Sequence, residues 1–245
     1  MALPAPPEGR AGGSGLVTEV ADGNSLTLAD GLTLVLAAVQ APLLPAARPP
    51  WPHASRSRAA LSALVLGQVV AWRQAQAPDR HGRVAAQVVL ADGRWLQAVL
   101  VADGQARVRC RSRSDHGLAE LLALEDEARA AGRGLWALDA YRVRTPDDVG
   151  DRLDRFHIVE GTIVRATRNG AQLFLDFGSD WRRDFSILVG APVRRDLERR
   201  GLDPMALAGV RVRVRGWAAW SFGPRIALAC AAQLEILDGV SSPPP

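Results

Sequence analysis

The sequence contains no lysine, so all 30 basic side chains among its 245 residues are arginines. Arginine stays protonated at any accessible pH, and the sequence pI of about 10.2 therefore overstates a formal net charge of only +4. A charge of this size permits a local patch for polyanions but does not demand one. Nucleic-acid binding has to be argued from particular residues.

Cysteine is almost absent too. Only Cys110 and Cys230 are present, far apart and outside any C-x-x-C or Cys/His pattern, which argues against a cysteine metal site. We expect two buried free thiols rather than a disulfide, because free cysteine packs as a small apolar residue.

Long apolar runs are missing as well. No stretch reaches the roughly 18 apolar residues that span a bilayer, so no membrane partner is expected. Residues 1–15 are rich in proline and glycine and lack the charged start and apolar stretch of a signal peptide. They predict a flexible tail, as do residues 239–245, and the missing signal favours a cytoplasmic location.

Turn signals and apolar alternation predict a first domain at residues 16–137. Asp22-Gly23 and Asp30-Gly31 separate three short strands. After them the pattern predicts a proline-rich loop at 42–52, a helix at 53–66, strands at 68–74 and 84–90, and helices at 95–102 and 118–131. This order is typical of an OB-type five-stranded barrel decorated with helices.

Three pieces of this domain carry a family resemblance: Ala-Asp-Gly-Asn-Ser at 21–25, Leu-Val-Leu-Ala-Ala-Val-Gln-Ala-Pro-Leu at 34–43, and Asp-Arg-His-Gly-Arg at 79–83. They resemble the staphylococcal-nuclease-type (thermonuclease) domain, whose signatures read D-G-D-T, R-L-x-G-I-D-A-P-E and D-R-Y-G-R. The resemblance implies phosphodiester hydrolysis with one Ca²⁺ held by carboxylates, a Glu as base and two Arg on the phosphate. It also implies a bacterial protein, and a periplasmic or secreted location as the alternative.

The residues that carry this chemistry are mostly replaced. Asn24 and Gln40 stand where the family has acids, Leu43 where it has the Glu, and Val35 where it has one Arg. Among these positions, Arg83 keeps the family's residue type. Neutral amides bring no charge to offset dehydration of a divalent cation, and leucine cannot accept a proton. We therefore predict a degenerate, non-catalytic site without a metal or other cofactor.

Two interpretations of the remaining acids stay open. Asp22, Asp30 or Asp79 could serve as relocated ligands in an active Ca²⁺-dependent phosphodiesterase. Alternatively, Asp22 and Asp30 begin β-turns and Asp79 shapes its loop. We favour the second, because loss of a single stabilising group can cost about 100-fold or more in rate.

Several arginines of the first domain are candidates for polyanion contact. Arg80 and Arg83 lie in the 79–83 loop and could bind phosphate or simply be solvated. A second set alternates with small or apolar residues and would share one face of an extended segment: Arg107, Arg109, Arg111 and Arg113. That face is either a polyanion stripe or an ordinary exposed surface. His81 and His116 have no partners at ligand spacing, so we expect surface residues.

A polar connector at 138–151 precedes a second predicted domain at 152–238. Its pattern predicts strands at 158–167, 173–177 and 184–189, a helix at 192–200, and strands at 209–217 and 226–237. This is again the OB order. The fold class predicted for the chain is mainly β with helices (α+β), as two tandem OB-type five-stranded barrels.

OB barrels bind single strands with arginines along the backbone and aromatic rings on the bases. The candidates are Arg165, Arg168, Arg182, Arg213, Arg215, Trp181 and Trp220. The favoured hypothesis is a binding or scaffold module for single-stranded nucleic acid. The alternatives are the active nuclease and a protein–protein interaction module.

Overall fold

The structure is a computed structural model that describes residues 3–8, 10–44, 49–111, 116–150, 153–180 and 182–237. The chain divides into two compact units. The first runs to Cys110 and continues to Tyr141, and the second begins at Arg142 and also takes in Arg111–Arg113. Within the described ranges, no helix has the length and apolar character needed to cross a membrane.

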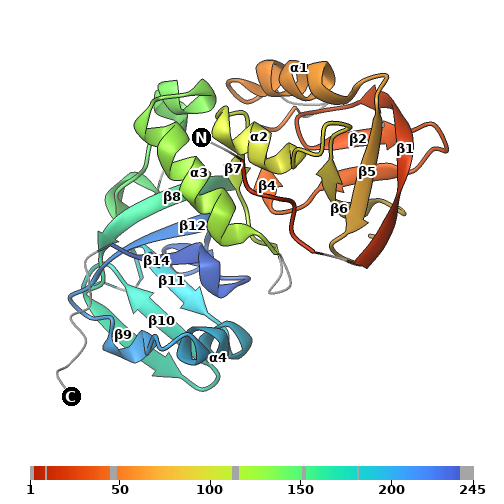
Figure 1. Cartoon of the computed structure of the whole chain (residues 1–245). Coiled ribbons are helices and arrows are strands. Elements are labelled where there is room, and N and C mark those ends of the chain that lie inside the picture. The colour runs from red at the N-terminus through yellow and green to blue at the C-terminus, as the bar shows by residue number, and fades with distance from the viewer. Residues whose placement is uncertain are drawn as a thin grey trace. The chain divides into compact units, whose positions relative to one another are not determined.

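Unit 1 is built on a closed five-stranded barrel (Figure 1). Its strands are β1 (Arg10–Val20), β2 (Ser25–Leu28), β3 (Thr33–Leu36), β5 (Val69–Gln74) and β6 (Val84–Val89). They follow the order β1-β2-β3-β6-β5, with β3 and β6 parallel and the other neighbours antiparallel. A separate ribbon pairs β4 (Val39–Gln40) with β7 (Arg107–Val108). The expected OB-type barrel of the first domain is confirmed.

The first strand begins earlier than expected. Residues 10–15 were predicted as part of a flexible tail, but they belong to β1, where Gly13 pairs with Trp72. A Cβ on Gly12 would lie 2.0 Å from the carbonyl oxygen of Trp72, so only glycine allows this approach. The Arg73 guanidinium also donates to the Pro7 carbonyl at 3.0 Å. The glycines that indicated flexibility instead permit tight packing.

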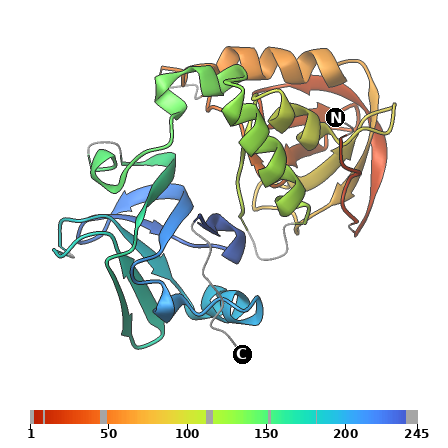
Figure 2. The ribbon, with the colours of Figure 1, turned by 60° about the vertical axis from the view of Figure 1, so that its left-hand side comes forward.

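Three helices accompany the barrel, close to their predicted positions: α1 (Ala54–Val65), α2 (Leu96–Ala102) and α3 (Leu118–Ala130). In Figures 1 and 2, α2 and α3 lie side by side. The 3₁₀ turns η1 (Gly134–Ala137), η2 (Asp139–Tyr141) and η3 (Pro146–Asp148) follow. The Tyr141 hydroxyl donates to the Pro52 carbonyl at 2.5 Å, so the start of the predicted connector packs on unit 1.

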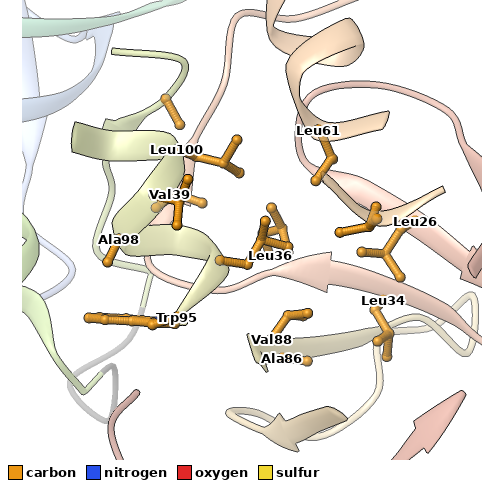
Figure 3. Close-up of a cluster of buried hydrophobic side chains, with 14 of the residues drawn as sticks. Leu26, Leu34, Leu36, Val39, Leu61, Ala86, Val88, Trp95, Ala98 and Leu100 are labelled. Carbon is orange, nitrogen blue, oxygen red and sulfur yellow. The ribbon is translucent and has the colours of Figure 1, made fainter. Parts of the chain in front are cut away.

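The core of unit 1 forms where inward-facing side chains of the strands meet α1 and α2. Leu26 and Leu34 lie within the barrel, Leu61 comes from α1 and Leu100 from α2, and all four are buried (Figure 3). Alternate burial along β2 and β3 is the period expected of strands with one buried face. Burial of this apolar surface stabilises the barrel and fixes its register.

Unit 2 is a seven-stranded sheet with one helix, α4 (Ala191–Arg199). Its strands are β8 (Arg155–Thr162), β9 (Arg165–Asn169), β10 (Gln172–Asp176), β11 (Ser186–Val189), β12 (Arg211–Trp220), β13 (Pro224–Ala227) and β14 (Leu234–Ile236). The order is β14-β12-β13-β11-β10-β9, and β8 pairs with β12. As in unit 1, one pair, β11 with β13, is parallel.

The five long strands predicted for this unit are not what the structure contains. The stretch 158–167 is divided into β8 and β9, and the stretch 226–237 into β13 and β14 with η5 (Ala231–Gln233) between them. The Gln233 side chain accepts from the amide of Ala229 at 2.6 Å and donates to the Arg215 carbonyl at 2.8 Å. Such side chain–backbone bonds compete with a continuous strand ladder. A second closed five-stranded barrel is not shown.

The two cysteines correct another expectation. Both are buried, as predicted, but Cys110 and Cys230 are disulfide-bonded rather than free thiols. Burial does not distinguish the two states, because a half-cystine packs as compactly as a free thiol.

Candidate functional site

Asn24, which the resemblance predicts to replace an acid, forms hydrogen bonds within its own turn and with Ala41. Its side-chain oxygen accepts from the Ala41 amide at 2.7 Å. The Asp22 carboxylate accepts from the Asn24 amide at 2.8 Å and from the Ser25 hydroxyl at 2.6 Å. Asn24 therefore ties the β1–β2 turn to the residue that follows β4, and Asp22 holds the turn itself.

Gln40, which the resemblance predicts to replace a second acid, faces the guanidinium of Arg109. Its side chain is buried, and its oxygen accepts from the Arg109 guanidinium at 2.5 Å. The Gln40 amide nitrogen donates to the Ala41 carbonyl at 2.8 Å. A guanidinium thus lies against the oxygen that a carboxylate ligand would direct at Ca²⁺.

The other acids also shape their own turns. Asp30 accepts from the Leu32 amide at 3.0 Å. Asp79 accepts from the Arg83 guanidinium at 2.7 and 2.8 Å, and from the His81 and Arg83 amides. The side-chain hydrogen bond from Arg83 is the main cause that lowers the pKa of Asp79 to about 2. These contacts agree with the interpretation of the aspartates as turn and loop residues.

The residues present do not fit a Ca²⁺ site of the family type. Within the part of the chain that the structure describes, no three His, Cys, Asp or Glu side chains gather closely enough to hold a metal ion. Leu43 and Val35 are half-buried, and Val35 lies in the β2–β3–β6 ladder opposite Ser25 and Ala85.

The arginine stripe expected at 107–113 does not exist as one exposed face. Arg107 is only 3% exposed and lies 5.0 Å from the centroid of the Tyr141 ring. Arg109 donates a hydrogen bond to the Gln40 side chain, Arg111 is exposed, and Arg113 lies outside the described residues. The reason is that β7 is two residues long and pairs with β4, which draws Arg107 inward. The loop residues Arg80 and Arg83 are exposed, as expected.

In unit 2, two predicted binding arginines are structural instead. The Arg215 side chain is 1% exposed and forms an ion pair with Glu235 at 2.6 Å. Arg213 lies directly opposite Glu160 of β8 and Glu235 of β14 in the strand register. Its guanidinium forms ion pairs with their carboxylates, at 2.7 Å to Glu160 and 3.2 Å to Glu235. The central strand β12 therefore uses these arginines to join its neighbours, and neither belongs to an exposed interface.

A pocket of about 630 Å³ lies on the outer face of unit 2. Nine residues line it: Arg165, Thr167, Asn169, Gln172, Phe174, Asp176, Ser221, Phe222 and Arg225. Three come from alternate positions of β9 and three from alternate positions of β10, so they share one face of that hairpin. The others come from the β12–β13 hairpin and from β13.

The strand register sorts the β9 and β10 residues into three facing pairs. Arg165 faces Asp176, and its guanidinium donates to that buried carboxylate at 2.9 and 3.1 Å. Thr167 faces Phe174. The third pair consists of two amides, Asn169 and Gln172, at the turn end of the hairpin. The pocket therefore has an ionic end and an uncharged polar end.

Arg225 covers the aromatic ring between these ends. Its guanidinium carbon lies 5.0 Å from the centroid of Phe174, and it donates to the hydroxyls of Ser186 at 3.0 Å and Ser221 at 3.3 Å. Burial lowers the pKa of Arg225, and the Asp176 carboxylate acts in the opposite direction. The Arg225 guanidinium and the Phe174 ring therefore form a cation–π contact in the pocket wall.

Of the other predicted residues, Trp220 is 60% exposed in the β12–β13 hairpin, beside the pocket residues Ser221 and Phe222. Arg168 is exposed near the β9–β10 turn, where it donates to the Gly170 carbonyl at 3.1 Å. Arg182 is exposed in a loop. Trp181 lies outside the described residues.

Sequence reasoning missed most of the pocket. Thr167, Asn169 and Gln172 were not singled out, and neither were Phe222 and Arg225. One signal was available: Arg165, Thr167 and Asn169 before the Gly170 turn, and Gln172 and Asp176 after it, are polar residues spaced two or four apart, which predicts a common face once the register is assumed. No local pattern in the sequence indicates that Arg225 of β13 also reaches that face.

Comparison with known protein families gives one match. Residues 33–138 match the family model of the staphylococcal nuclease homologue. The match begins at β3, so it includes Val35, Gln40, Leu43 and Arg83 and leaves Asn24 just outside. It covers three of the five barrel strands (β3, β5 and β6) and the helices α1 to α3. Unit 1 of this chain therefore carries a staphylococcal nuclease homologue domain.

Proposed function

We propose that the protein binds single-stranded nucleic acid without cleaving it, and that the pocket of unit 2 is the contact site. The observation that carries this proposal is the exposed pocket between the β9–β10 and β12–β13 hairpins, with Arg225 layered on Phe174. Single-strand binding proteins combine arginines for the backbone with stacking surfaces for the bases. Trp220, which is exposed on the β12–β13 hairpin, would extend the contact, whereas Arg168 alternates to the other face of the β9–β10 hairpin, opposite Leu173.

The strand order of unit 2 supports an OB-type assignment, which is part of the proposal. If β8 and β9 are two halves of one strand, and β13 and β14 two halves of another, the order becomes that of unit 1. OB barrels bind oligonucleotides on the face of their second and third strands and on two hairpin loops. In that numbering, the pocket is lined by β9 of the first strand, by the second strand β10, and by the hairpin between the fourth and fifth strands, so it shares one strand and one hairpin with that surface.

The active nuclease is the less supported alternative. An amide and a guanidinium meet at Gln40 and Arg109, and the acids nearby hold turns. Unit 1 would then act as a scaffold that retains the barrel of its family and not its chemistry.

The test is fluorescence anisotropy with labelled single-stranded DNA and RNA of about 20 nucleotides, long enough to cover one barrel. We expect saturable binding that weakens as salt rises from about 50 to about 200 mM, with the oligonucleotide intact on a gel, with Ca²⁺ or with chelator. Cleavage that needs Ca²⁺ would overturn the non-cleaving assignment. Absence of binding at the lowest salt would overturn the function and leave a protein partner.

The pocket is tested with matched charge changes. Arg225→Ala removes the pocket guanidinium and should weaken binding about tenfold, since stacking and charge are lost together. Arg195→Ala removes an exposed arginine from α4, outside the pocket, and should change the affinity about twofold at most. Equal effects of the two variants would argue against the pocket.

A further inference from the structure

The pocket carries little uncompensated charge. Its acid, Asp176, is paired with Arg165, so Arg225 contributes the one remaining charge among the nine lining residues. Arg225 is itself bonded to two serine hydroxyls and layered on Phe174. Phosphate sites instead gather several free guanidinium, ammonium or backbone N–H donors. The interior of the pocket is therefore better suited to a neutral group.

Its open hydrogen-bonding groups are uncharged. The side chains of Thr167, Asn169 and Gln172 are exposed and make no hydrogen bond with any other described residue. Each amide offers one carbonyl acceptor and two N–H donors. Asn169 and Gln172 face each other across the hairpin, so both side chains lie on one face at the turn end of the pocket. This pair can read the edge of a planar ring.

The stacking surface lies beside these amides. The Arg225 guanidinium lies over the Phe174 ring, between the amide pair and the ion pair, and Phe222 is 66% exposed on the β12–β13 hairpin. Aromatic and guanidinium planes stack on nucleobases regardless of sequence. A volume of about 630 Å³ is within the usual range of small-molecule pockets.

We infer that this pocket takes a single nucleobase of the bound strand and prefers adenine. The inference rests on the proposed function and specifies its substrate. Asn and Gln amides pair bidentately with adenine, whereas guanine is read by free arginines. Here Arg165 is held by Asp176, and Arg225 by Ser186 and Ser221. A carboxylate could accept from cytosine, but Asp176 is buried in its ion pair.

The experiment compares single-stranded homopolymers of adenine, cytosine and thymine, each about 12 nucleotides long, by anisotropy at one salt concentration. The adenine strand should bind about tenfold more tightly than the others. Asn169→Ala with Gln172→Ala should remove this preference while thymine-strand affinity stays within about twofold. Gln68→Ala, which removes an exposed amide from unit 1, should keep the preference.

The outcomes separate the two proposals. Equal affinity for all homopolymers in the wild-type protein would overturn the base preference alone. A preference that survives in the double variant would overturn its assignment to Asn169 and Gln172. No binding of any homopolymer would overturn the proposed function as well. Competition by free adenosine but not by cytidine, measured on the wild-type protein, gives a readout that does not depend on the folding of a variant.

Discussion

The two units have similar strand orders but differ in the hydrogen bonding of particular polar side chains. Each contains one parallel strand pair, β3 with β6 and β11 with β13, and a helix, α1 or α4, before the next long strand. In unit 1, the side chains of Asn24 and Gln40 bond to other residues of the same unit. In unit 2, the amides of the β9–β10 face remain open. The comparison teaches that binding capacity depends on which polar groups the fold leaves unsatisfied.

The largest expected effect is on the stability of unit 2, on removal of the buried Arg215 side chain that pairs with Glu235. Arg215→Ala should destabilise unit 2 by about 3 kcal/mol, because it leaves the Glu235 carboxylate without its closest partner. Arg211→Ala removes a more exposed ion pair on the same strand and should cost less than about 1 kcal/mol. Both are measured by chemical denaturation of the full chain, fitted with separate transitions for the units. Unchanged stability with lost oligonucleotide binding would instead make Arg215 a binding residue.

A smaller effect is expected at the Gln40–Arg109 contact of unit 1. Arg109→Ala should destabilise this unit by about 1–3 kcal/mol, because the buried Gln40 oxygen loses a charged donor. Adding Gln40→Leu should cost no more than the single change, since both partners are then gone. Excess Ca²⁺ should leave the melting temperature of the wild-type protein unchanged. A rise that chelator reverses would mean that a Ca²⁺ site exists.

The smallest effect concerns the 79–83 loop. The pKa of Asp79 is lowered from 3.8 to about 2, so its contact with Arg83 stabilises the loop fully above pH 3.8 and is lost as the pH falls through about 2. Arg83→Ala should return the pKa of Asp79 toward 3.8, with little change in global stability, because the pair is exposed. An NMR titration of the Asp79 carboxyl measures this. A pKa that stays low in the variant would assign the shift to the backbone N–H donors.

Much of unit 1 could be predicted because its signals are local. These signals are the two Asp-Gly turns, the alternation of apolar residues in the strands and the proline-rich segment before the first helix. Together they predicted a barrel with three helices. The replaced residues at positions 24, 35, 40 and 43 were readable directly from the motifs. The strand at residues 10–15 was missed, because glycine is typical of both flexible tails and close packing. The division between β13 and β14 in unit 2 coincides with side chain–backbone bonds from Gln233, which no local pattern indicates.

The sequence by itself determined the barrel of unit 1 and which residues stand at the motif positions, because turn residues and motif spacing act over a few neighbours. Only the tertiary structure decided which arginines reach solvent. Arg107 lies under a tyrosine 34 positions away, and Arg213 faces glutamates 53 and 22 positions away. The same holds for the pocket, where Arg225 meets Phe174 from a distant strand. Exposure and pairing depend on register between segments far apart in the chain, and no spacing within one segment encodes that register.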